Sequence, residues 1–322
     1  LSGDFEFPLG AAPVIARTGK GFVILFNQRD PSTIDSVVLT GPFNRVRLGI
    51  EDLKRGHFEY DSFTKQSVNH QIWVRIPERT PDDLYDLTVF SQGVASLSKR
   101  SVKIVRKYPS AHKFIHISDP HISRQWTGIP ENGYAKELEL FDRFVDVANM
   151  IAPDFILVTG DIIHHYTMFD ADSTGWGGKK VYLPEEKPEA EEKFRSYFEG
   201  AKGFSGIADL HSPVFSLPGN HDFYGVSRDN YMDLASQWNK FCGKRVYGFS
   251  YAGTRVLAAD NFLGDPVTDR PDSALLSGLQ GRQLASFLQE EGAGKIRILA
   301  QHRHHLCDTG FINRNKIQIL LN

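Results

Sequence analysis

The first third of the chain alternates short apolar runs with turn-forming residues. The runs, spaced about ten residues apart, are GFVILFNQ, DSVVLTGPF, RVRLGI, HQIWVRIP, YDLTVF and SVKIVRKY. Alternation of apolar and polar positions is typical of strands that bury one face. No convincing helical period interrupts these runs. The pattern therefore predicts an all-β, antiparallel sandwich domain over residues 1–110.

From residue 111 the pattern changes to strands that alternate with helices. Apolar runs predict strands at KFIHIS, FILVT, PVFSL, YGFSY, TRVLAAD, KIRILA and KIQILL. Apolar residues at three-and-four spacing predict a helix at about 135–152, and further helices are expected at 188–200 and 279–291. Continuously apolar strands indicate a sheet covered on both faces. We therefore predict a second, α/β domain over residues 111–322.

Composition and charge narrow the class of protein. The chain has 37 basic and 39 acidic residues and a formal net charge of −2, so its bulk charge does not favour nucleic acid or acidic lipid as a partner. This sum describes the whole chain and says nothing about a local basic patch. Two cysteines are too few for a cysteine-rich zinc module.

The apolar runs also bear on the membrane and on the compartment. No run approaches the roughly 18 apolar residues of a membrane span. The chain starts with Leu1 and has no signal-peptide pattern, which fits either a processed or a trimmed product. Together with the sandwich, this leans toward an exported protein over a cytoplasmic one.

Polar residues able to bind a metal follow four of the predicted strands. They are Asp119 and His121, Asp161, Asn220 with His221 and Asp222, and His302. In open α/β sheets, ligands bind at the carboxyl ends of the strands. Carboxylate, amide and imidazole groups together suit Mn²⁺, Fe or Zn²⁺. The sequence therefore predicts a metal site at this edge of the sheet.

The motifs D-P-H (119–121), G-D (160–161), G-N-H-D (219–222) and the isolated histidine at 302 occur in this order. They resemble those of the calcineurin-like metallophosphoesterase superfamily over about residues 113–322. The resemblance implies an α/β/β/α sandwich, here preceded by an all-β sandwich of fibronectin or immunoglobulin type.

The resemblance also implies two divalent or trivalent metal ions, with Mn, Fe or Zn expected. Asp119 and His121 would bind the first metal, and Asp161 would bridge both. Asn220 and His302 would bind the second metal. The reaction it implies is hydrolysis of a phosphoric ester, monoester or diester, by a hydroxide that bridges the two metals.

Two residues of G-N-H-D have implied roles in catalysis. His221 would protonate the leaving oxygen, and Asp222 would orient its ring. The residues His164, His165 and Tyr166 follow the bridging aspartate and are expected to line the substrate pocket, as is His304. The expected partner is a small phosphorylated substrate.

One element of the family pattern, a closing G-H-x-H, is absent from the sequence. Either the chain stops short of it after KIQILLN, or His304 or His305 replaces a ligand. The missing ligands also keep open a phosphoesterase-fold scaffold without catalysis. A nuclease stays open as well, because His164 occupies a position where the nuclease branch of the superfamily carries a histidine.

Overall fold

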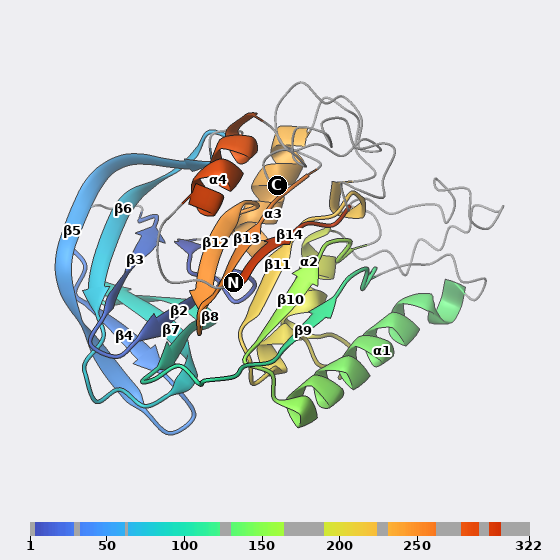
Figure 1. The fold of residues 1–322 in the computed structure, drawn as a ribbon, viewed down its shortest axis with the longest axis horizontal. Helices are drawn as coiled ribbons and strands as arrows, with labels where there is room; N and C mark the ends of the chain where they lie inside the picture. Colours follow the sequence, from blue (N-terminus) through green and yellow to red (C-terminus); the bar gives the residue numbers. More distant parts are fainter. Residues whose placement is uncertain are drawn as a thin grey trace.

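The computed structural model describes residues 4–28, 33–61, 64–122, 130–163, 190–223, 231–261, 278–289 and 296–303. Figure 1 shows a large sheet, in blue and teal, beside two smaller sheets and their helices. In the same view, the smaller sheets lie between the large sheet and helix α1 (Pro130–Ile151). Among these described residues, no helix is long and apolar enough to cross a membrane.

The amino-terminal sheet has eight strands in the order β1-β3-β6-β5-β4-β7-β8-β2. Their bounds are β1 Phe5–Phe7, β2 Val14–Arg17, β3 Gly21–Phe26, β4 Ser36–Thr40, β5 Arg45–Asp61, β6 Gln66–Arg75, β7 Asp83–Ser91 and β8 Val94–Val105. The six predicted runs are confirmed as strands, while β1 and β2 were not predicted. Neighbouring strands are antiparallel except β2 and β8, which are parallel, so the expectation of a wholly antiparallel region was wrong at this edge.

Strand β5 explains how eight strands share one core. Its first residues pair with β4 and the rest with β6, with three register irregularities on the way. Irregular register bends a strand and increases its twist. Inward-facing residues of several strands, such as Ile24, Val37, Ile72 and Tyr85, then meet in one buried cluster.

The rest of the described chain builds two three-stranded sheets. The first, in the order β11-β10-β9, is parallel and consists of β9 Phe114–Ile117, β10 Phe155–Thr159 and β11 Val214–Leu217. The second contains β12 Tyr247–Tyr251, β13 Thr254–Ala258 and β14 Ile296–Ala300, with β13 parallel to β14 and antiparallel to β12. Six of the seven predicted strands are thus confirmed, and KIQILL lies outside the described residues.

The helices α1, α2 (Ala190–Glu199) and α4 (Gly278–Gln289) match the predicted ones, but α3 (Tyr231–Cys242) was missed. Its buried positions Ala235, Trp238 and Phe241 recur every three residues. That spacing is the helical signal that should have been recognised.

The two small sheets pack against each other. One apolar cluster contains Phe155 and Phe215 of the first sheet and Val256 of the second, and the rings of Phe215 and Phe249 stack with their centroids 3.7 Å apart. A second cluster joins the opposite faces of β10 and β13 to all four helices. Both faces of each sheet are therefore covered, which fixes the strands and the loops that follow them.

Candidate metal centre

The loops that leave β9 and β10 run side by side. The backbone N–H of Asp119 donates to the Gly160 carbonyl (3.0 Å), and the N–H of His121 donates to the Asp161 carbonyl (2.9 Å). Parallel pairing of the strands delivers the two loops to the same edge. The motifs D-P-H and G-D, 40 residues apart, are thus joined through their main chains before any side chain is considered.

Three of the predicted metal ligands have left-handed backbone conformations. The φ angles are 60° at Asp119, 49° at His121 and 54° at Asp161. Non-glycine residues rarely adopt this region, and such residues gather at functional sites, where the surrounding structure holds them in place. The conformation turns these side chains toward one point instead of letting them alternate along a strand.

Two glycines let the loops after β10 and β11 approach closely. A Cβ atom at Gly160 would lie 2.5 Å from the Gly219 nitrogen, and one at Gly219 would lie 2.2 Å from an Asp161 carboxylate oxygen. Gly160 also has a φ of 93°. A side chain at Gly219 would displace Asp161, and one at Gly160 would push against the Gly219 backbone, which is why G-D and G-N-H-D begin with glycine.

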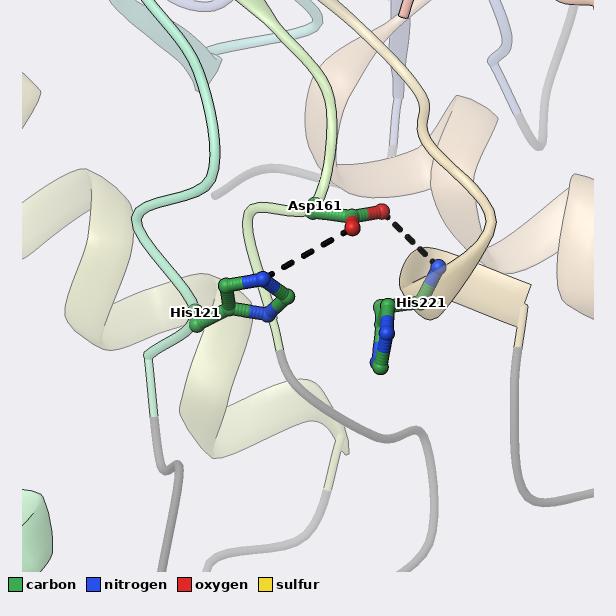
Figure 2. A group of neighbouring side chains, drawn as sticks. All are labelled: His121, Asp161 and His221. Carbon is green, nitrogen blue, oxygen red and sulfur yellow. Dashed lines mark hydrogen bonds and ion pairs between the residues drawn. The ribbon is translucent and has the colours of Figure 1, made fainter. Parts of the chain in front are cut away.

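Asp161 is the centre of the arrangement and is almost fully buried. Its two carboxylate oxygens point in different directions, as Figure 2 shows: Oδ2 lies 3.7 Å from His121 Nε2, and Oδ1 accepts the backbone N–H of His221 at 2.9 Å. His121 Nε2 also lies 3.5 Å from Asp119 Oδ1. The rings of His121 and His221 meet edge to face with their centroids 4.7 Å apart.

His302 reaches Asp161 from the second sheet. Its Nε2 lies 3.3 Å from Asp161 Oδ2, and its Nδ1 lies 2.7 Å from the Thr159 carbonyl oxygen. The carbonyl can only accept, so Nδ1 carries a proton and Nε2 faces the site. Burial lowers the pKa of this ring, but Asp161 and Thr159 outweigh it and raise the pKa to about 9. A metal at Nε2 would have to displace a proton.

Asp119 contributes a carboxylate that is ionised at neutral pH. Burial raises its pKa, but hydrogen bonds from His121 and Ser118 outweigh this and lower the pKa from 3.8 to about 2. The carboxylate is half exposed, in contrast to Asp161. Asp119 therefore offers an anionic oxygen that solvent can reach.

Asp222 is completely buried and binds backbone groups. Its carboxylate accepts N–H bonds from Asp161 (2.9 Å), Ile163 (3.1 Å) and Gly219 (2.8 Å). These bonds tie the loop after β10 to the loop after β11. Burial and the neighbouring Asp161 charge raise the pKa of Asp222, while the N–H groups oppose this. Its predicted action on the ring of His221 stays a prediction.

Two sets of side chains offer ligand atoms within 4.8 Å of one another, and Asp161 belongs to both. One set is His121, Asp161 and His221; the other is Asp119, Asp161 and His302. Carboxylate and imidazole donors fit Mn²⁺, Fe or Zn²⁺, so the donor chemistry suits the predicted metals. This grouping differs from the expected one. Asp119 was expected to share a metal with His121, but it lies in the same set as His302.

Some predicted site residues are placed only in part. Asn220 is buried between two residues that contact Asp161 or Asp222 through their backbone N–H groups. The predicted substrate contacts His164, His165, Tyr166 and His304 lie outside the described residues, and so does His305. That His304 or His305 replaces a ligand of the missing G-H-x-H therefore stays a prediction, as does the alternative that the chain stops short of this motif.

The sequence reading missed two supporting residues. Ser118 donates its hydroxyl to the Thr159 carbonyl (3.2 Å), the same oxygen that faces His302 Nδ1. Thr159 thus connects the loop after β9 with His302. Both residues lie at strand ends, so the rule that found the ligands could also have found these polar neighbours.

Comparison with known proteins identifies a family but no close individual relative. No curated protein matches the chain. Among solved structures, an amylomaltase from Corynebacterium glutamicum aligns at 15% identity over 50% of this chain, with a TM-score of 0.23. This chain spans 22% of the length of that amylomaltase, and so distant a likeness carries no argument.

The family model for calcineurin-like phosphoesterases matches residues 112–316. The matched region begins just before β9 and includes every motif described above. The match covers more than half of the chain, and the predicted resemblance is therefore confirmed. The chain belongs to the calcineurin-like phosphoesterase family.

Proposed function

We propose that the protein hydrolyses a small phosphorylated substrate, a phosphomonoester or phosphodiester, with two metal ions held around Asp161. The observation that carries this proposal is that the Asp161 carboxylate belongs to both candidate ligand sets. A carboxylate with two ligand neighbourhoods is what a bridging ligand requires. Family membership supports the hydrolase class.

The proposed division of labour follows the chemistry of each group. Two bound metal ions supply a hydroxide nucleophile at neutral pH and neutralise charge on the phosphoryl oxygens. Asp119, His121, Asp161, Asn220 and His302 would hold the metals. His221, whose ring meets that of His121, would donate a proton to the leaving oxygen.

We also propose a specific type of sandwich for each of the two regions. For the carboxyl-terminal region we infer the four-layer α/β/β/α sandwich, supported by the two apolar clusters on the faces of its sheets. For the amino-terminal region we infer a fibronectin- or immunoglobulin-like sandwich, supported by its mostly antiparallel strands and separate core.

The test compares two aspartates at opposite ends of β10. Asp161→Asn should abolish Mn²⁺ binding and hydrolysis of p-nitrophenyl phosphate and of bis-p-nitrophenyl phosphate. Asp154→Asn is the matched control, because Asp154 precedes the strand and its carboxylate accepts the Tyr251 hydroxyl (2.6 Å). Wild-type, control and variant proteins are loaded with Mn²⁺, desalted and analysed for metal content and turnover.

The outcomes separate the hypotheses. Two Mn²⁺ per chain and turnover in the wild type and control, but neither in Asp161→Asn, would support the hydrolase. Metal binding without turnover on either ester would favour a nuclease or another specific substrate. No metal in the wild type would contradict the proposal and favour the scaffold.

A further inference from the structure

A buried cluster of charges joins the amino-terminal sheet to the region matched by the family model, residues 112–316. Arg245, just before β12, donates from Nη2 to both carboxylate oxygens of Asp61 (3.1 and 3.0 Å) at the end of β5. Its Nη1 donates to Asp260, just after β13. The Arg245 side chain is 5% exposed, and that of Asp260 is fully buried.

One guanidinium lies between two carboxylates in this cluster. Burial lowers the pKa of Arg245, but Asp260 and Asp61 outweigh it and raise the pKa above the usual value. Asn239 adds a bond from Nδ2 to Asp61 Oδ2 (2.8 Å) and is itself fully buried. Asp61 is therefore one of two carboxylates that hold the Arg245 side chain in place, and its removal would leave Arg245 paired with Asp260 alone.

The cluster continues toward the metal centre. Asn261 follows Asp260, is fully buried, and donates from Nδ2 to the Arg303 carbonyl (2.8 Å). The backbone N–H of Ala259 donates to the Ala300 carbonyl (2.9 Å). These bonds hold both ends of the turn that contains His302, whose Nε2 lies 3.3 Å from Asp161.

We propose that Asp61, a residue of the amino-terminal sheet, is a positioning residue for the metal centre and acts through Arg245 and Asp260 on the loop that carries His302. The amino-terminal region thereby contributes to metal affinity without supplying a ligand. This inference rests on the proposed function, because it concerns the metal that His302 would hold.

The first experiment measures Mn²⁺ binding by calorimetry to the wild type and to Asp61→Asn. Residues that orient metal ligands typically contribute about 10- to 100-fold in affinity, so Asp61→Asn should weaken one binding step about tenfold. The matched control is Asp82→Asn, which removes a carboxylate paired with Arg106 in an exposed ion pair of the same region. The control should bind like the wild type.

Variants at His302 separate positioning from general destabilisation. His302→Ala should weaken the same binding step as Asp61→Asn. The double variant should bind Mn²⁺ like His302→Ala alone, because the two changes act on one ligand. Additive losses in the double variant, or unchanged affinity in Asp61→Asn, would overturn the inference.

A second measurement needs no metal. Amide hydrogen exchange in residues 296–303 should be faster in Asp61→Asn than in the wild type, while exchange in residues 155–159 should stay the same. Equal exchange in residues 296–303, or acceleration everywhere, would contradict the proposed connection. If wild-type protein binds no Mn²⁺, the proposed function fails, and this exchange comparison still decides whether Asp61 orders the loop.

Discussion

Two groups of carboxylates in this molecule are compensated in different ways. At the junction of the two regions, Asp61 and Asp260 share the guanidinium of Arg245. At the carboxyl ends of the strands, the described ion-pair contacts of Asp119 and Asp161 are to His121 and His302. A guanidinium is permanently charged, whereas imidazole can release its proton and expose a metal-binding nitrogen. The first group therefore suits a fixed structural role, and the second suits exchange of protons for metal ions.

The largest expected effect is the loss of the fixed cation at the junction. Arg245→Met keeps much of the side-chain volume but leaves Asp61 and Asp260 without their partner. Removal of one member of a buried ion pair costs about 3–5 kcal/mol. We expect urea denaturation to show a loss of this size in the free energy of unfolding.

The control for that comparison is an exposed pair in the amino-terminal region. Arg106 Nε lies 2.7 Å from Asp82 Oδ1, and the Arg106 side chain is 69% exposed. Arg106→Met should cost about 0–1 kcal/mol, the range for exposed pairs. Equal losses of unfolding free energy in the two variants would show that the buried cluster contributes no more to stability than an exposed ion pair.

The strand-end group should respond instead to an added cation. Free Mn²⁺ at 100 times its dissociation constant should stabilise the wild type by about 2.7 kcal/mol per site, because only the folded chain assembles the ligands. Thermal unfolding with and without Mn²⁺ measures this effect. Asp161→Asn should lose the stabilisation, and Asp154→Asn should retain it. A Mn²⁺-dependent shift in Asp161→Asn equal to that of the wild type would locate the binding elsewhere.

The strand-end group was predictable and the junction was not. Asp119, Asp161 and His302 each follow a short apolar run, so one rule about parallel sheets places them together. Asp61 and Arg245 are separated by 184 positions, and nothing in either neighbourhood indicates the other. Asp260 follows an apolar run as well, and the same rule places it at the correct edge without revealing its partner.

Some local features also exceed what a pattern can predict. The bonds from three backbone N–H groups to Asp222 depend on how two loops approach, which the motif G-N-H-D does not encode. The full length of β5 was missed because the part after Ile50, with residues such as Glu51 and Lys54, is mostly polar and exposed. The boundary between residues 110 and 111 stays a prediction.

A smaller effect is expected from a third kind of carboxylate, a partly buried one whose pKa is raised by burial. Burial raises the pKa of Glu6 from its ordinary 4.5 to about 7, against opposing hydrogen bonds from Tyr60 and Asn27. Between these two pH values the folded chain binds more protons than the unfolded chain. Stability should therefore fall as pH rises from 4.5 to 7 and level off above 7.

Glu6→Gln keeps an oxygen acceptor for the Tyr60 hydroxyl, which lies 2.6 Å from Glu6 Oε2, but cannot ionise. The variant should match the wild type near pH 4.5 and exceed its melting temperature at pH 8. Glu59→Gln, an exposed residue of β5, changes the net charge equally and should leave the pH dependence as it is. Parallel curves for Glu6→Gln and wild type would mean that Glu6 is ionised in the folded protein. Glu6 would then resemble the junction carboxylates and require a cation of its own, because burial without a partner would not allow that charge.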